Sequence, residues 1–124
     1  MSAARILVVD DNPSNLRLVC AVLRFAGHDV YTAVDAEAAQ ALIDAGKPFD
    51  LILMDVSLPG MDGLELTRRL KANEATRHVP IAILTASAMK GDDQKAAASG
   101  ADGYFTKPIN TRTFPLEVSK LLAR

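Results

Sequence analysis

Three runs of apolar residues without intervening polar positions constrain the fold most strongly. Ile6–Val9, Leu51–Met54 and Ile81–Leu84 each keep apolar side chains at consecutive positions. Because neighbouring residues of a strand point to opposite faces of a sheet, such strands must be buried on both faces. This pattern is typical of a parallel sheet that is covered by helices, and it predicts an α/β fold.

Two weaker strand-like runs, Val30–Ala33 and Gly103–Phe105, bring the predicted strands to five. Capping residues and glycines predict a helix after each strand. These helices are expected over Asn12–Gly27, Asp35–Gly46, Gly63–Ala72, Asp92–Gly100 and a segment that opens at Asn110 or Thr113 and runs through Leu122. The alternation predicts one (βα)5 domain over residues 1–124, a doubly wound parallel five-stranded sheet. Right-handed crossovers leave few strand orders, of which the flavodoxin-like order 2-1-3-4-5 is the best known at this size.

Pro115 restricts where the last helix can begin. Proline beyond the first turn removes a backbone hydrogen bond and clashes with the preceding turn. A helix that opens at Asn110 would therefore be kinked, whereas a helix that opens near Thr113 would not. Both alternatives are open at this point.

Charge balance and cysteine content exclude several classes of function. The 15 Asp and Glu against 14 Lys and Arg give a net charge of −1, without the basic excess of a nucleic-acid-binding protein. Cys20 is the single cysteine, which excludes an internal disulfide and a cysteine-based zinc site. No uncharged apolar run approaches the roughly 18 residues that span a bilayer, and residues 1–5 lack a signal-peptide core. We therefore expect a cytoplasmic domain without membrane insertion.

Chemically reactive side chains follow four of the five predicted strands. Asp10 and Asp11 follow the first, Asp55 the third, Thr85 the fourth and Lys107 the fifth. A single residue of this kind is usually a turn or capping residue. The carboxyl ends of parallel strands, however, meet at the edge of the sheet where ligands bind, so we expect these side chains to converge.

Three carboxylates crowded at one edge repel one another unless one is protonated or a cation neutralises them. An all-oxygen set of ligands favours Mg²⁺ (or Mn²⁺), and His28 and His78 are expected on the surface at the opposite ends of strands. A metal ion beside an aspartate, with a hydroxyl and a lysine nearby, is a layout for phosphoryl transfer. In such a site an aspartate acts as nucleophile and forms an acyl phosphate.

These motifs resemble those of the receiver domain of two-component response regulators, the CheY-like superfamily. The resemblance covers essentially the whole chain, and its markers are Asp10-Asp11, the segment Asp55-Val56-Ser57-Leu58-Pro59-Gly60-Met61-Asp62-Gly63, Thr85-Ala86 and Lys107-Pro108. It implies that Asp55 accepts a phosphoryl group from a phosphohistidine on a histidine kinase or a histidine phosphotransfer protein. It also implies a conformational switch that regulates partner proteins, and not an enzyme.

The resemblance further assigns roles to single residues. It implies that Asp11, Asp55 and the backbone carbonyl of Ser57 ligate Mg²⁺, while Asp10 acts mainly through water. Lys107 would pair with the phosphoryl group. Thr85 and Tyr104 match the switch pair of the family, in which the hydroxyl moves toward the phosphoryl group and the ring turns inward.

Hydrolysis of the acyl phosphate is expected to be tuned by Ser57 and Ser87, which flank the phosphoryl position. Their small hydroxyls leave room for water, so hydrolysis should not be strongly blocked. Residues 86–93 are similar to those of stand-alone DivK-type receivers, which act in bacterial cell-cycle and polarity signalling, and to receivers of PleD-type regulators.

The first predicted helix is apolar around most of its circumference, with only Arg17 and Arg24 charged between Leu16 and Ala26. Such a helix is either deeply packed or presents a docking surface. In the receiver family the kinase or phosphotransfer helices dock there. The resulting candidates for docking are Leu16, Val19, Leu23 and Pro108. In the same family the last helix belongs to the output face, so Pro115 puts the usual dimer contact in doubt, and we expect a monomer or a weak dimer.

Four other interpretations stand beside a stand-alone phosphorylated switch. A flavin-binding protein would share the fold, but Asp10 and Asp11 would repel a phosphate at the loop after the first strand. A phosphatase with an aspartyl nucleophile normally has two aspartates two positions apart, and here they are adjacent. A receiver that binds partners without phosphorylation, and a receiver that is part of a larger regulator, also stay open.

Overall fold

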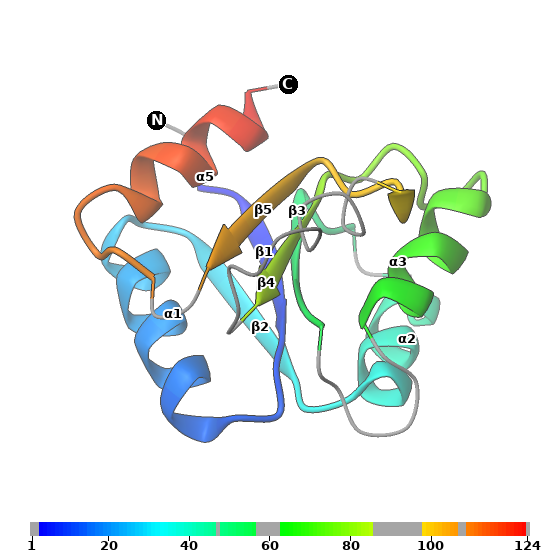
Figure 1. Cartoon of the computed structure of the whole chain (residues 1–124), viewed down its shortest axis with the longest axis horizontal. Helices are drawn as coiled ribbons and strands as arrows, with labels where there is room; N and C mark the ends of the chain where they lie inside the picture. Colours follow the sequence, from blue (N-terminus) through cyan, green and yellow to red (C-terminus); the bar gives the residue numbers. More distant parts are fainter. Residues whose placement is uncertain (1–2, 47, 57–62, 86–97, 107–108, 124) are drawn as a thin grey trace.

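The computed structural model describes residues 3–46, 48–56, 63–85, 98–106 and 109–123. From residue 5 to residue 85, strands and helices alternate along the chain, as Figure 1 shows. The strands are β1 (Arg5–Val9), β2 (Asp29–Ala33), β3 (Leu51–Asp55), β4 (Ile81–Thr85) and β5 (Gly103–Thr106). The helices in the described part are α1 (Pro13–Phe25), α2 (Ala36–Asp44), α3 (Gly63–Ala72) and α5 (Phe114–Leu122).

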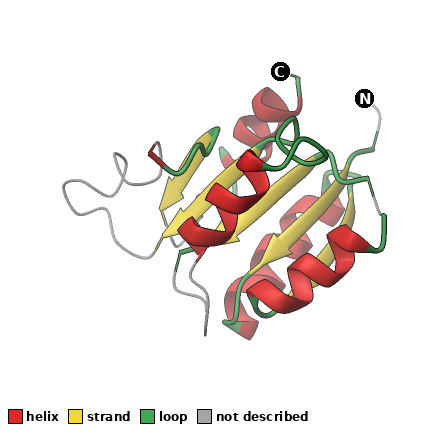
Figure 2. Cartoon of the chain, turned by 90° about the vertical axis from the view of Figure 1, so that its right-hand side faces the viewer, coloured by secondary structure: helices red, strands yellow, loops and turns green. Residues whose placement is uncertain are grey.

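All five strands pair in parallel in the order β2-β1-β3-β4-β5, which confirms the predicted sheet. The arrowheads of the strands therefore lie at the same edge of the sheet (Figure 2). The predicted helix over Asp92–Gly100 lies largely outside the described residues. Within the described ranges, no helix is long and apolar enough to cross a membrane.

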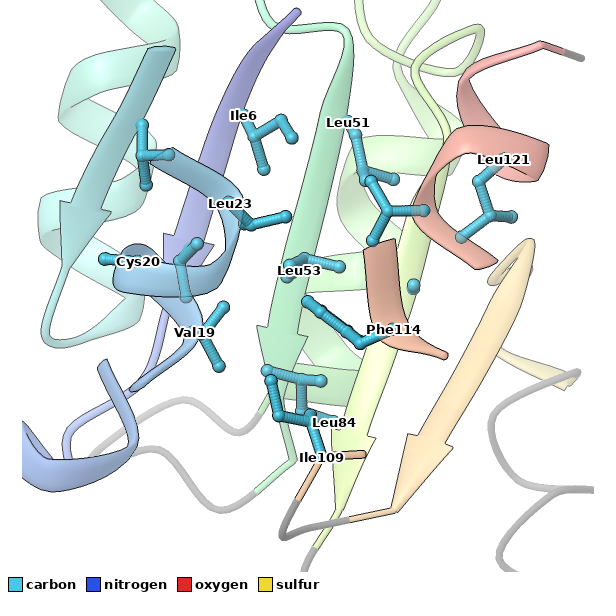
Figure 3. Packing of buried hydrophobic residues seen from close by; sticks show 14 of the residues in the cluster. Ile6, Val19, Cys20, Leu23, Leu51, Leu53, Leu84, Ile109, Phe114 and Leu121 are labelled. Atoms are coloured by element: carbon cyan, nitrogen blue, oxygen red, sulfur yellow. The ribbon is translucent and has the colours of Figure 1, made fainter. Parts of the chain in front are cut away.

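The two faces of the sheet bury two separate sets of apolar side chains, one against α1 and α5 and the other against α2 and α3. Ile6 and Val8 belong to the α1–α5 cluster, shown in Figure 3, whereas their neighbours Leu7 and Val9 belong to the other. All four are completely buried. Consecutive residues of each apolar run thus pack into different clusters on opposite faces of the sheet. This is why apolar and polar residues do not alternate in these strands.

Helix α1 begins and ends at the residues that the sequence indicates. The Asn12 side chain accepts a hydrogen bond from the backbone N–H of Asn15 at 3.1 Å, and Pro13 occupies the first helical position. Gly27 ends the helix with φ at +94°, a left-handed conformation that suits glycine. Asp35 caps α2 in the same way, by accepting from the N–H of Ala38 at 2.7 Å.

Helix α5 begins at Phe114 with Thr113 as its N-cap, so Pro115 lies in the first turn. Proline is tolerated there because the N–H groups of the first turn have no partner within the helix. Of the two alternatives left open by the sequence, the later start is the correct one, and a helix opening at Asn110 is not observed.

The side chains of His28 and Cys20 are both buried. The sequence predicts His28 on the surface, but it is buried and its Nδ1 accepts a hydrogen bond from the N–H of Ala4 at 3.1 Å. That prediction is wrong because the partner of the imidazole comes from a segment distant in the chain. Cys20 lies in the α1–α5 cluster, where burial raises the pKa of its thiol and nearby Arg24 partly opposes the shift.

A partly buried ion pair joins the end of α3 to the loop before β5. The Lys71 Nζ donates to Asp102 Oδ2 at 2.6 Å and to the carbonyl oxygen of Val79 at 2.8 Å. The same Asp102 oxygen accepts the backbone N–H of Ile81 at 2.9 Å, at the first residue of β4. Asp102 therefore holds the starts of β4 and β5 against α3.

We predict that Asp102→Ala lowers the free energy of unfolding by about 2–3 kcal/mol, because it removes the carboxylate partner of the partly buried Lys71 ammonium and the acceptor of the Ile81 N–H. Urea unfolding measures this. The matched control is Asp44→Ala, at the exposed end of α2, where the carboxylate accepts an exposed hydrogen bond from the Gln40 side chain. Its effect is expected to stay within about 0.5 kcal/mol, as for most surface substitutions. Equal effects of the two substitutions would contradict the prediction.

Candidate functional site

Three carboxylates converge at the carboxyl edge of the sheet, as predicted. Asp10, Asp11 and Asp55 each present a carboxylate oxygen within 4.8 Å of the others. The register explains why, since β1 and β3 pair Val9 with Met54 and the next residue of each strand is an aspartate. Asp10 and Asp55 are buried, whereas Asp11 is exposed. The parallel pairing therefore brings together groups that are far apart in the chain.

Both the main chain and the side chain of Asp10 form hydrogen bonds that fix its position. Its backbone N–H donates to the carbonyl of Ala33 at the end of β2, at 3.0 Å. Its carboxylate accepts the backbone N–H of Asn12 on Oδ1, at 2.9 Å, and the side-chain amide of Asn15 on Oδ2. Asn15 is not among the residues predicted for the site. The signal that marks it is the Asn-x-x-Asn spacing directly after the two aspartates.

Gly63, the first residue of α3, lies against the backbone of Asp55. A Cβ atom at Gly63 would be 1.8 Å from the Asp55 carbonyl oxygen and 2.8 Å from its carbonyl carbon. The N–H of Gly63 also donates to the carbonyl of Val56 at 3.0 Å. Only a residue without a side chain allows this approach, so Gly63 positions the start of α3 directly beside the candidate phosphoacceptor. Gly63 belongs to the motif that begins at Asp55, but the motif by itself does not predict this contact.

Thr85 and Tyr104 lie on β4 and β5, on the same side of β3 in the sheet. Thr85 is the last residue of β4 and is buried, and the Val56 N–H donates to the Leu84 carbonyl at 3.1 Å, which holds the ends of β3 and β4 together. Tyr104 lies in β5 opposite Ile83 and packs partly buried against the α2–α3 cluster. The structure thus brings a buried hydroxyl to the edge that carries Asp55.

Four other predicted site residues lie outside the described part of the chain. They are Ser57, Ser87, Lys107 and Pro108. Lys107 directly follows Thr106, the last residue of β5, in the sequence.

The docking face predicted on α1 needs correction. Val19 and Leu23 have no exposed surface, because both side chains pack into the α1–α5 cluster, and Leu16 is only partly exposed. Val19 and Leu23 therefore cannot contact a partner, and this part of the prediction is wrong. The helix instead exposes Leu18, at 37%, and Phe25, at 96%.

The chemistry of the three carboxylates fits a hard divalent cation. Each offers an oxygen ligand, the oxygens are close enough to share one ion, and a divalent charge offsets their mutual repulsion. The described residues place no histidine or cysteine in this cluster, so a soft metal such as zinc is not favoured.

Comparison with known proteins identifies the family to which the sequence of this chain is similar. The response regulator receiver domain family matches residues 6–118. The chain is 44% identical over 108 residues to the response regulator PleD of Caulobacter vibrioides, covering 87% of this chain and 24% of that protein. It is 36% identical over 109 residues to the polar-differentiation response regulator DivK of Brucella anthropi, covering 88% of each.

One solved structure of similar fold contains a bound metal ion. It is the receiver domain of the sensor histidine kinase PA1611 of Pseudomonas aeruginosa, with a magnesium ion coordinated in its active-site cleft. The TM-score is 0.86 and the identity is 35%, over 99% of this chain and 100% of that one. The chain spans only about a quarter of the length of PleD, so what PleD does outside the matched segment does not transfer.

We predict that Gly63→Ala lowers the free energy of unfolding by about 2 kcal/mol, since the new Cβ must displace the backbone of Asp55. Urea unfolding measures the loss. In the control Gly103→Ala, the added Cβ meets Leu121 side-chain atoms at 3.2 and 3.3 Å, and these can move aside. A loss for Gly63→Ala no larger than for Gly103→Ala would show that the approach of α3 to Asp55 is not tight.

Proposed function

Because the chain belongs to the response regulator receiver domain family, we propose that Asp55 is its phosphoacceptor and that phosphorylation switches its contacts with partner proteins. The observation that carries this proposal is the cluster of Asp10, Asp11 and Asp55 at the carboxyl edge of the sheet. Asp55 lies at the end of a fully buried strand, which holds its carboxylate in place for attack on a phosphohistidine. The phosphoryl group moves from the histidine nitrogen to the Asp55 oxygen, and the histidine leaves.

Mg²⁺ would be held by Asp11 and Asp55, with the backbone carbonyl of Ser57, and would neutralise charge on the phosphoryl oxygens. Asp10, which is completely buried in the same cluster, would act mainly through water. We further propose that Lys107 pairs with the phosphoryl group, as its place directly after β5 allows. Because the phosphoryl group ends on a residue of the domain itself, we propose a phosphoacceptor and not a multiple-turnover enzyme.

The switch is proposed to operate through Thr85 and Tyr104. A phosphoryl group at Asp55 adds negative charge and strong hydrogen-bond acceptors beside the buried hydroxyl of Thr85. Contacts of Thr85 and Lys107 with that group exist only in the phosphorylated state, so they favour the active conformation. A change from 1:99 to 99:1 requires about 5.5 kcal/mol of such differential interaction, which a few charge-assisted hydrogen bonds can supply.

The partners are proposed to be a histidine kinase or a histidine phosphotransfer protein as donor, and proteins that read the switch. On α1, the exposed side chains of Leu18 and Phe25 support docking of a donor on this helix. The similarity to the polar-differentiation response regulator DivK supports, by analogy, a role in bacterial polarity control. A link to the cell cycle and a cytoplasmic location are further parts of the proposal. A monomer or a weak dimer is also part of the proposal. A receiver that binds partners without phosphorylation is the alternative, and the complete set of carboxylates argues against it.

Phosphorylation is tested by incubating the protein with Mg²⁺ and acetyl phosphate and measuring its intact mass. We expect the addition of one phosphoryl group, which is absent after Asp55→Asn and absent when Mg²⁺ is removed with EDTA. The control Asp44→Asn changes an aspartate at the end of α2, away from the carboxylate cluster, and should be phosphorylated like the wild type.

No mass gain with either acetyl phosphate or a phosphorylated histidine kinase would refute the proposal and favour a phosphorylation-independent binding module. A yellow protein on purification would point instead to flavin binding. Rapid turnover of a phosphate ester would indicate a phosphatase.

A further inference from the structure

We infer that Asn15 is a positioning residue for the metal site, which fixes the plane of the Asp10 carboxylate and thereby raises the affinity for Mg²⁺. The inference rests on the proposed function, since it takes the cluster of Asp10, Asp11 and Asp55 as the site that holds the ion.

Both oxygens of Asp10 accept a hydrogen bond from the start of α1. The side-chain amide of Asn15 donates to Oδ2, and the backbone N–H of Asn12 donates to Oδ1 at 2.9 Å. The torsion that rotates an aspartate carboxylate has broad minima, so the side chain alone does not define its plane. Donors on both oxygens do define it, and among the described residues the Asn15 side chain is the donor to Oδ2.

Asn15 is itself held in place by the cap of α1. It is the third residue of the helix, and its backbone N–H donates to Asn12 Oδ1 at 3.1 Å. Asn12 therefore binds both the aspartate and the residue that orients it. Asn15 is only partly buried and belongs to neither apolar cluster, so its replacement changes the carboxylate without removing core packing.

The chemistry of an asparagine suits this position. Asp10 is completely buried, and its oxygen lies within 4.8 Å of those of Asp11 and Asp55. A buried carboxylate needs hydrogen-bond donors to offset the loss of water, and an amide supplies one without bringing a positive charge. A lysine or arginine at position 15 would place a cation beside the cluster and compete with Mg²⁺.

The test is isothermal titration of the protein with Mg²⁺, comparing wild type, Asn15→Leu and Ser14→Ala. Loss of a group that orients a direct metal ligand typically weakens metal affinity by about 10–100-fold. Because Asp10 would act mainly through water, we expect the lower end of that range, about a tenfold rise in Kd, for Asn15→Leu. Ser14 lies exposed in the same helical turn, so Ser14→Ala should bind as the wild type does. Phosphorylation by acetyl phosphate should slow for Asn15→Leu at limiting Mg²⁺ and recover at saturating Mg²⁺.

Thermal unfolding in EDTA measures the stability of each variant without metal, and so distinguishes a positioning role of Asn15 from a purely structural one. If Asn15→Leu loses thermal stability but keeps the wild-type Kd for Mg²⁺, the inference is wrong while the proposed function stands. A wild-type protein that binds no Mg²⁺ overturns both. Should Asn15→Leu fail to fold, Asn15→Ala provides the same comparison, because its small side chain suits a helix and also lacks the amide.

Discussion

Negative charge gathered at one edge of the sheet is the constraint on which the rest of the structure depends. Asp10 and Asp55 follow paired positions of β1 and β3, strands that are buried on both faces and cannot move apart without breaking two cores. Their carboxylates and that of Asp11 lie within 4.8 Å of one another. Repulsion at this distance must be offset, by N–H donors from the start of α1 and, in the proposed function, by a divalent cation.

Helix α1 both packs against the sheet and orients the carboxylate of Asp10. Its inner side buries Val19 and Leu23 completely against the sheet, while its first turn orients Asp10 through Asn12 and Asn15. Its outer side exposes Phe25. The same helix therefore contacts the core, the carboxylate cluster and solvent. A partner that docks on its outer side would bind an element that is hydrogen-bonded directly to Asp10.

Elements defined by local pattern were predictable, and contacts between distant segments were not. Asn12 and Asp35 cap their helices as expected, and Pro115 permits only the later start of α5, because capping and proline geometry depend on a few neighbouring residues. The burial of His28 was not predictable because its partner is the N–H of Ala4, 24 residues away. The burial of Val19 and Leu23 escaped prediction because an apolar helix does not reveal from its sequence which side faces the sheet.

The residue pattern alone thus decided the α/β class, the parallel sheet and the set of candidate groups, because each depends on strand periodicity, on capping and on the residues directly after each strand. Only the tertiary structure decided how these groups meet. The register that sets Val9 beside Met54 brings Asp10 to Asp55, and the approach of α3 requires Gly63 to lack a side chain. The amide of Asn15 reaches Asp10 through the turn that starts α1. Such contacts depend on the packing of elements in space, which no local pattern specifies.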